Sequence, residues 1–79
     1  MLVLKIVSTE KVVYQGEVES VTVPGTLGEF EILVDHAPII SSLEKGCVKY
    51  KTKEGEQRID ILGGFVQVKR NEVSVCVEV

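Results

Sequence analysis

VSVCVEV, residues 73–79, places a valine at every second position of the last seven residues of the chain. A repeat of two is the period of a β-strand, because successive side chains on a strand point to opposite faces. We therefore predict a strand here with one buried face, formed by the valines. Shorter pieces of the same pattern recur upstream, which indicates a fold built from strands.

The segment directly upstream alternates in the same way. In FVQVK, residues 65–69, the two valines fall on one side and Gln67 and Lys69 on the other. RNE, residues 70–72, lies between the two predicted strands, and an asparagine such as Asn71 tolerates the positive φ that tight hairpin turns require. We predict an antiparallel hairpin with its turn at these three residues.

Glycine and proline mark the other turns. KEGE, residues 53–56, places a glycine between two strand-like runs and predicts a second hairpin. Pro24-Gly25 predicts a further turn. The adjacent Gly63-Gly64 indicates a bend or a close approach of two backbones, because no helical pattern follows that would form a phosphate-binding loop.

Strands are expected in most of the remaining sequence. No segment of helical length has apolar residues that repeat at three and four positions, although residues 38–43 are interpreted as a short turn. Besides the two strands described above, the predicted strands cover residues 2–7, 11–15, 17–23, 29–34, 47–52 and 57–62.

The length and composition favour a single all-β domain, residues 1–79. Hydrophobic residues make up 44% of the chain, with no tryptophan, and the β-branched ones among them suit a pleated surface. A chain this short builds one modest core. Because two packed sheets hide the apolar faces of short strands, we predict a small two-sheet β-sandwich of short, mostly antiparallel strands.

Charge and the start of the chain narrow the function classes. The net charge of −3 provides no broad positive field, which argues against nucleic acid as a partner. The first residues, MLVLK, lack the features of a signal peptide, and no apolar run approaches the roughly 20 residues that cross a bilayer. We expect a cytoplasmic protein that meets a membrane only through a partner.

The two cysteines, Cys47 and Cys76, stand alone in alternating segments, without the close paired spacing of a zinc site or a redox motif. We expect buried thiols, since an unpaired cysteine commonly behaves as a small hydrophobic side chain. A disulfide between them is an open alternative. No catalytic, cofactor or metal site is predicted.

PGTLGEFEILVDHAP, residues 24–38, resembles the signature of the ATP synthase epsilon family, which includes the chloroplast epsilon and mitochondrial delta chains. That family commonly shows Gly-Glu-x-Gly-Ile-x-Pro-Gly-His-Ala-Pro here. Three residues depart from the pattern: Glu31 replaces a glycine, and Val34 and Asp35 replace the Pro-Gly pair. The positions kept in register are Gly28, Glu29, Ile32, His36, Ala37 and Pro38.

The resemblance covers essentially the whole chain. IISSLEKG, residues 39–46, resembles the family's apolar pair, hydroxyl-rich turn, leucine and glycine before the next strand. GGFVQV, residues 63–68, and NEVSV, residues 71–75, resemble its Gly-Gly-Phe strand and closing hairpin. Typical relatives continue into two helices that resemble a movable inhibitory arm, and some carry a helical ATP-binding motif. This sequence includes neither, so we expect no such arm and no nucleotide sensing.

The resemblance implies a non-catalytic central-stalk (rotor) subunit of a proton- or sodium-translocating rotary ATP synthase. Its partners would be the gamma subunit and the c-ring, it would lie peripherally on the cytoplasmic face of the bacterial inner (plasma) membrane, and it would need no cofactor. By residue match, the candidates for contact with the c-ring are Gly28, Glu29 and His36. Tyr14 and Tyr50 are candidates for the gamma interface, or they fill a sheet edge.

Simpler roles are open for the same residues. Glu29 also fits a solvated carboxylate at a strand start, and His36 also fits a loop-bracing hydrogen bond. Lysines 49, 51 and 53 alternate and form either a basic stripe or, as we expect, a solvated face. An enzyme is disfavoured, because the chain has one histidine and no nucleophile placed beside it.

Lys53 supports the main alternative function. A lysine at the hairpin tip of a small, acidic, all-β domain is also the arrangement of a lipoyl-like carrier, and a protein-binding β module would share the fold. The surrounding KEGE does not resemble the usual Asp-Lys presentation of carriers. The carrier is therefore the second hypothesis.

Overall fold

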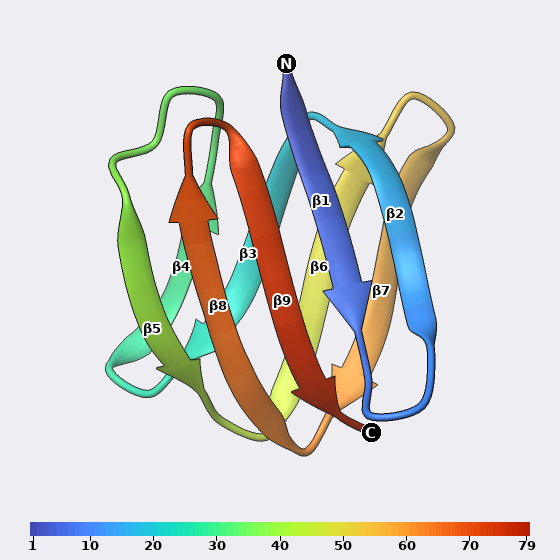
Figure 1. Ribbon diagram of the computed structural model, residues 1–79, viewed down its shortest axis with the longest axis vertical. Coiled ribbons are helices and arrows are strands. Elements are labelled where there is room, and N and C mark those ends of the chain that lie inside the picture. Colours follow the sequence, from blue (N-terminus) through green and yellow to red (C-terminus); the bar gives the residue numbers. More distant parts are fainter.

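The chain folds entirely into strands and turns (Figure 1). The computed structural model describes all residues, 1–79, and contains nine strands and no helix. The strands are β1 (Leu2–Val7), β2 (Val12–Val18), β3 (Ser20–Gly25), β4 (Gly28–Ile32), β5 (Ile39–Leu43), β6 (Gly46–Thr52), β7 (Gly55–Ile61), β8 (Gly63–Lys69) and β9 (Glu72–Glu78).

The strands lie in two layers, which Figure 1 shows one in front of the other. We call β2-β1-β9-β8-β5 the front sheet and β4-β3-β6-β7 the back sheet. All paired strands are antiparallel except β1 and β9, which are parallel. The predicted two-layer sandwich of mostly antiparallel strands is confirmed.

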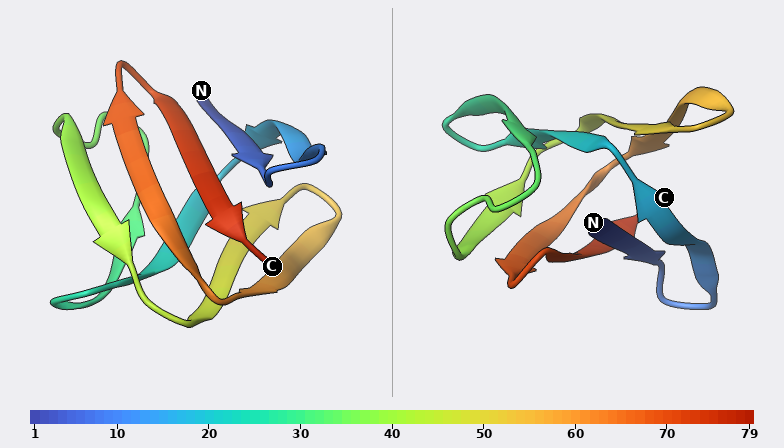
Figure 2. Two further views of the ribbon diagram at one scale, coloured as in Figure 1. Left: turned by 60° about the horizontal axis from the view of Figure 1, so that its bottom comes forward. Right: turned by 90° about the horizontal axis from the view of Figure 1, so that it is seen from above.

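The two sheets are hydrogen-bonded to each other along one side of the molecule. β3 of the back sheet pairs with β6 near its start and, through Gly25, with Leu43 of β5 near its end. The chain therefore curls from one layer into the other, as the views in Figure 2 show. On the opposite side, β2 and β7 end the strand order without pairing with each other.

Side chains that point inward from both sheets form one core. Val73, Val75 and Val77 of β9 are buried, as the alternation predicts, whereas Val79 lies beyond the strand and is exposed. The buried members of the core are Leu2, Leu4, Ile6, Val18, Val21, Val23, Ile32, Leu43, Val48, Tyr50, Ile61, Val66, Val68, Val73, Val75 and Val77.

The turn between β8 and β9 is the predicted one. Arg70 and Asn71 have φ values of 51° and 62°, and the strand residues on either side of them, Lys69 and Glu72, pair with each other. Positive φ at both central residues matches the twist of the flanking strands. The close backbone approach expected at the paired glycines is also confirmed, because a Cβ added to Gly64 would overlap the backbone of β9.

The interpretation of residues 38–43 as a short turn is wrong. Ile39–Leu43 is β5, which forms the edge of the front sheet and pairs with β8 along its length. Leu43 points into the core, whereas Ile40 is 73% exposed. The strand is only five residues long and contains two adjacent serines, so its alternation is too short to recognise.

The turn predicted at Pro24-Gly25 lies two residues later, at Thr26-Leu27, because both Pro24 and Gly25 belong to β3. A proline lacks an amide donor, which restricts it within sheets. The missing donor breaks no ladder bond here, because Pro24 faces the β5–β6 connection, where its carbonyl accepts the Glu44 amide at 2.8 Å.

The break between the second and third strands also lies elsewhere than predicted. Gly16 is inside β2, and the chain leaves the strand at Glu19. A Cβ at Gly16 would come within 2.9 Å of the Tyr14 hydroxyl. This glycine therefore makes room for the tyrosine ring rather than ending a strand.

The cysteines are not the buried thiols that we expected. Both are free and half-buried. Cys76 lies between two inward valines of β9 and therefore points to the outer side of the front sheet, while Cys47 precedes the buried Val48 and points to the outer side of the back sheet. Thiols on opposite outer faces cannot form a disulfide within one molecule.

Candidate functional site

The first predicted contact residues, Gly28 and Glu29, begin β4 directly after a tight turn. Gly25 pairs with Gly28, so Thr26-Leu27 is a two-residue turn, and Gly28 takes a φ of 130° that favours glycine. Leu27 at the tip is completely exposed, and Glu29 is exposed beside it. We call residues 26–29 the Gly28 turn.

A small groove lies behind the Gly28 turn. Its volume is about 290 Å³, and Phe30 and Ile39 contribute apolar side chains to its lining. These two residues come from β4 and β5, which do not pair with each other. The turn therefore presents an exposed leucine, a carboxylate and an apolar hollow together, which suits contact with another protein.

The third predicted contact residue, His36, lies in the loop of residues 33–38 between β4 and β5. Its ring Nδ1 is 2.8 Å from the Ala37 carbonyl oxygen, and its backbone amide donates to the Leu33 carbonyl at 3.2 Å. The side chain is half-buried. These contacts match the loop-bracing role that the sequence left open for this histidine.

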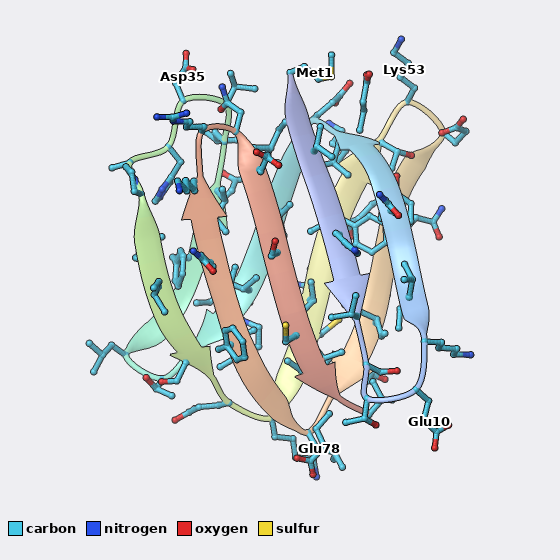
Figure 3. The ribbon with its side chains drawn as sticks, in the orientation of Figure 1. Met1, Glu10, Asp35, Lys53 and Glu78 are labelled. Carbon is cyan, nitrogen blue, oxygen red and sulfur yellow. The ribbon has the colours of Figure 1, made fainter.

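The structure does not bring His36 and Glu29 together. The Gly28 turn precedes β4 and the loop of residues 33–38 follows it, so the two lie at opposite ends of that strand and of the sandwich (Figure 1). Figure 3 labels Asp35, the neighbour of His36, at the upper end of the sandwich, the end at which Met1 and Lys53 also lie. One flat partner surface cannot contact both ends.

Asp35 and Asn71 form a contact that sequence analysis missed. The Asp35 amide donates to Asn71 Oδ1 at 2.6 Å, and Asn71 Nδ2 donates to Asp35 Oδ1 at 3.1 Å. Both residues have positive φ, 65° and 62°. One signal in the sequence could have indicated the positive φ at residue 35. Asp35 stands where the family commonly has a glycine, and aspartate and asparagine are the side chains that best tolerate this conformation.

The two candidate tyrosines stack on each other between the sheets. The Tyr14 and Tyr50 ring centroids are 4.5 Å apart, and Tyr50 is only 9% exposed. Burial and, to a lesser degree, the neighbouring Tyr14 raise the pKa of the Tyr50 hydroxyl above its ordinary value of 10.0. The pair lies on the side where β2 and β7 are unpaired, so it fills a sheet edge there.

An apolar row crosses the outer face of the front sheet. Val12 pairs with Val7, Val7 with Cys76, and Cys76 with Phe65, and all four side chains are at least partly exposed. We call these four residues the apolar row. A hollow of about 420 Å³ lies beside Val7, Phe65 and Cys76. The row joins four strands, so it became visible only with the strand register.

The outer face of the back sheet carries charges instead. One row across it runs from Glu31 through Thr22 and Lys49 to Arg58, and Lys51 pairs with Glu56 in the next row. Lys51 therefore faces an acidic residue and Lys49 lies between Thr22 and Arg58, so charges of both signs share this face, which fits the expected solvated face rather than a basic stripe. Lys53 lies at the tip of the β6–β7 hairpin (Figure 3).

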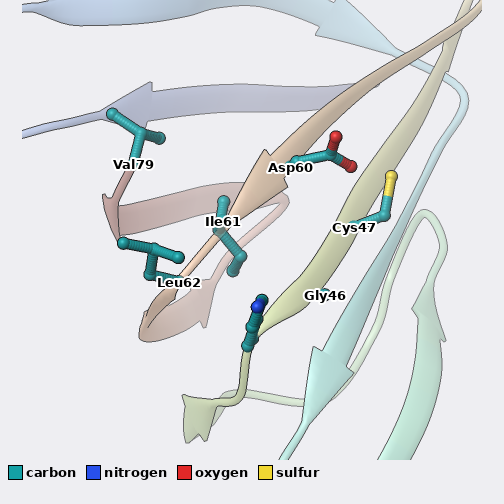
Figure 4. Close-up of a pocket in the computed structure, with 7 residues that line it drawn as sticks. Gly46, Cys47, Asp60, Ile61, Leu62 and Val79 are labelled. Carbon is teal, nitrogen blue, oxygen red and sulfur yellow. The ribbon is translucent and has the colours of Figure 1, made fainter.

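The largest pocket shows no arrangement for catalysis. It is an open hollow of about 560 Å³ between the ends of β6, β7 and β9 (Figure 4). Its only polar side chains are those of Lys45, Cys47 and Asp60, and the Cys47 thiol contacts its own strand, 3.8 Å from the Val48 carbonyl, instead of a base. No group of three or more His, Cys, Asp or Glu side chains is gathered as a metal ion requires.

Comparison with known proteins gives one consistent family. Residues 1–79 match the family model described as the β-sandwich domain of the ATP synthase delta/epsilon chain. The ATP synthase epsilon chain of Leptospira borgpetersenii is 40% identical over 75 residues, which are 95% of this chain and 59% of the relative. That of Synechocystis is 37% identical over 76 residues, or 96% of this chain and 56% of the relative.

Solved structures agree on the fold. A chain of the Euglena gracilis mitochondrial ATP synthase superposes with a TM-score of 0.90 at 22% identity, covering 96% of this chain and 49% of the other. A chain in the central stalk and c-ring structure of the Tetrahymena thermophila mitochondrial ATP synthase gives 0.83 at 15% identity, covering 99% and 63%. The chain thus spans about 60% of the length of the curated relatives. It contains no helix of the length and hydropathy needed to span a membrane.

Proposed function

The chain belongs to the family of ATP synthase delta/epsilon β-sandwich domains, and from this membership we propose that it is a central-stalk subunit that couples the gamma subunit to the c-ring in a proton- or sodium-translocating rotary ATP synthase. The match along all residues, 1–79, carries this proposal. A subunit in that place performs no chemistry. It transmits torque through several rigid contacts, and close packing between two sheets supplies rigidity.

The outer face of the front sheet is the proposed docking surface for gamma. The molecule measures 28 by 24 Å across its two longer dimensions, and Figure 1 looks along the shortest one onto this face. A stable interface covers about 800 Å² on each partner, so most of this face is needed. The apolar row, which lies toward the end of this face where β1 ends and β2 begins, supplies the apolar part of the interface, because interfaces bury apolar side chains inside a polar rim.

The tyrosines contribute less to this interface than the sequence suggested. Tyr50 is buried and offers little surface to a partner. Tyr14 is half-buried, and its hydroxyl donates to the Glu17 carbonyl at 3.4 Å. Of the two, Tyr14 alone keeps enough exposed surface to join a gamma interface, at its margin.

The Gly28 turn is the proposed contact with the c-ring. Glu29 would pair with an arginine or lysine on a ring loop, Leu27 would bury against the loop, and Gly28 supplies the turn that presents both. A carboxylate that becomes desolvated and paired contributes strongly to such a contact. His36 lies at the other end of the sandwich, so it is not part of this ring contact. The subunit would lie peripherally at the cytoplasmic face of the bacterial plasma membrane.

Capture of both partners tests this function. The purified chain is immobilised and offered gamma and detergent-solubilised c-ring, separately and together. We expect wild type to retain both, and Glu29→Ala to weaken ring capture at least about tenfold while gamma capture is unchanged. Glu56→Ala, on the charged outer face, is the control for loss of one carboxylate. Failure of the wild type to retain either partner would exclude the rotor role.

The lipoyl-like carrier has a single observation in its favour, the position of Lys53 at a hairpin tip. Hydrogen bonds within the turn hold it in place, because the Thr52 hydroxyl contacts both Glu54 Oε2 at 3.1 Å and the Gly55 carbonyl at 3.2 Å. Intact-mass measurement of the chain isolated from its own cell separates the two functions. An added acyl group on Lys53 would support the carrier.

A further inference from the structure

We propose that two copies of the free chain bind each other through the outer faces of their front sheets, in a reversible dimer that covers the apolar row. The same face is the proposed docking surface for gamma, so the second copy and gamma would exclude each other. That competition rests on the proposed stalk function, whereas the dimer itself rests only on the outer face of this chain.

The apolar row is the first observation that favours a second copy. None of its four side chains is charged, Val12 and Phe65 are exposed, and Val7 and Cys76 are half-buried. An exposed apolar row on a small domain favours association with another apolar surface. A second copy supplies the same row, and two-fold symmetry allows the two rows to lie on each other.

The rows on either side of the apolar row carry opposite charges. On one side, Lys5 pairs with Ser74. On the other side, Glu78 follows Cys76 along β9 and pairs with Gly63. The side chains of Lys5, Ser74 and Glu78 are all exposed on the outer face. Ser74 and Glu78 are about 13 Å apart along the strand, so Lys5 and Glu78 of one molecule do not pair with each other.

A two-fold axis that runs along the apolar row, between the two faces, satisfies both observations. Rotation about this axis places the apolar row of one copy on that of the other. It also places Glu78 opposite Ser74 of the second copy and diagonal to Lys5 of the second copy. The dimer would thus contain two Lys5–Glu78 pairs. An axis along β9 would instead place Glu78 opposite its own counterpart, which like charges disfavour.

The size of the shared surface fits a weak dimer. The molecule measures 28 by 24 Å in the two dimensions that Figure 1 shows. Because the apolar row lies toward one end of the face, two copies that overlap about it cover only part of this outline. That part is smaller than the roughly 800 Å² per partner of a standard interface. Such a dimer is reversible, and a partner that covers the whole face displaces it.

Exchange of the paired charges tests this geometry. Sedimentation equilibrium of the purified chain at low salt should show a reversible monomer–dimer equilibrium. Lys5→Glu alone and Glu78→Lys alone each replace two attractions by two repulsions, so each should weaken the dimer about tenfold. A mixture of the two variants restores both pairs in the mixed dimer and should dimerise as wild type does. No recovery on mixing, or a wild type that stays monomeric at every concentration, would overturn the proposal.

Lys51 and Glu56 provide the matched control, because they pair with each other on the outer face of the back sheet. Lys51→Glu and Glu56→Lys change the net charge by the same amounts as the two front-sheet variants. We expect both to dimerise as wild type does. A loss equal to that of Lys5→Glu or Glu78→Lys would show that net charge, and not contact between front sheets, governs association, and would overturn the proposal.

Thiol reactivity locates the contact by a second measurement. Cys76 belongs to the apolar row and Cys47 lies on the opposite outer face, and both thiols are free and half-buried. As the concentration of the chain rises, alkylation of Cys76 by iodoacetamide should slow, while alkylation of Cys47 stays constant. Phe65→Ser removes the largest side chain of the row and should abolish this concentration dependence. Equal behaviour of the two thiols in wild type would overturn the proposed contact.

Addition of gamma distinguishes the dimer from the stalk function. We expect gamma to convert the dimer into a complex that contains one copy of the chain, measured by sedimentation velocity. A chain that binds gamma but never dimerises would overturn the dimer and leave the stalk function standing. A chain that dimerises but does not bind gamma would overturn the stalk function and leave the dimer standing. A complex that holds gamma and both copies would overturn the competition for one face.

Discussion

The outer faces of the two sheets differ although their inner faces are alike. Both sheets send valines and isoleucines into one core, to which the front sheet adds leucines and the back sheet adds Tyr50. Outside, the front sheet carries the apolar row, whereas the back sheet carries rows of mixed charge such as Glu31, Lys49 and Arg58. The two sheets thus differ most on the faces that point away from the core, and an apolar outer face is what the proposed gamma interface on the front sheet requires.

Exposure of the apolar row to water is unfavourable for a free protein, which makes the difference between the two outer faces more informative. Exposed apolar patches favour association, and mixed charges on the other face keep a small domain soluble. The apolar row depends on close contact between β8 and β9, where Cys76 and Phe65 pair. Substitutions at three places therefore test the contrast between the two outer faces, in order of decreasing expected effect.

The largest effect is expected from Gly64→Ala in the front sheet. Gly64 has a φ of 150°, and an added Cβ would meet the Val77 Cα at 3.0 Å and the Cys76 carbonyl closer still. Strain and overlap together should lower the free energy of unfolding by at least about 3 kcal/mol, measured by chemical denaturation. The clash would separate β8 from β9 and disrupt the apolar row.

Gly55→Ala in the back sheet is the counterpart. Gly55 also has a positive φ, 119°, but no atom lies within 4 Å of an added Cβ. Backbone strain alone should cost about 1–2 kcal/mol. If the two variants lose equal stability, then the close approach of β8 and β9 does not exist in solution, and the register that aligns the apolar row is wrong.

The second effect concerns Phe65, the largest side chain of the apolar row. Phe65 is 46% exposed, so Phe65→Ser should change stability little but remove an anchor of the proposed gamma interface. Loss of a central aromatic contact costs about 2 kcal/mol of binding, or about 30-fold in affinity. Titration calorimetry with gamma measures it.

Arg58→Ser makes the same kind of change on the other face, at the end of the charged row. Rim or solvated charges contribute little to binding, so its affinity for gamma should stay within about twofold of wild type. A larger loss from Arg58→Ser than from Phe65→Ser would assign gamma to the back sheet and reverse the comparison.

The sequence predicts the inner faces far better than the outer ones. Alternation identifies inward residues one strand at a time, so the burial of Val73 and Val75 followed from residues 73–79 alone. The predicted hairpin already places Phe65 near Cys76, but whether Val7 joins them depends on the register between β9 and β1, which are distant in sequence. No local pattern encodes the register between β1 and β9.

The candidate sites show the same difference between what a local sequence pattern predicts and what only the fold reveals. Glu29 and His36 are close in the sequence signature, but β4 separates them in space. Asp35 and Asn71 are 36 residues apart and in contact. Residues 38–43 were misjudged because a five-residue edge strand with two serines has almost no period to detect. A short signature predicts that a segment is important, and the fold decides which of its residues act together.

The smallest expected effect concerns the inner faces, and it tests whether the difference between the two sheets is confined to their outer faces. Tyr50 is a polar-tipped side chain that points inward from the back sheet and stacks on Tyr14 of the front sheet. Its pKa is raised in the folded protein, first by burial and then by Tyr14. Above pH 10 the unfolded chain therefore loses this proton while the folded chain keeps it. The contribution of Tyr50 to the free energy of unfolding is thus fully present below pH 10 and is lost as the pH rises through the folded pKa.

Tyr50→Phe should change the free energy of unfolding at pH 7 by about 0.5 kcal/mol or less. It should also make stability decline less steeply at alkaline pH, measured by urea unfolding from pH 8 to 11. An equally steep decline in the variant would show that a group other than Tyr50 causes the loss of stability at alkaline pH.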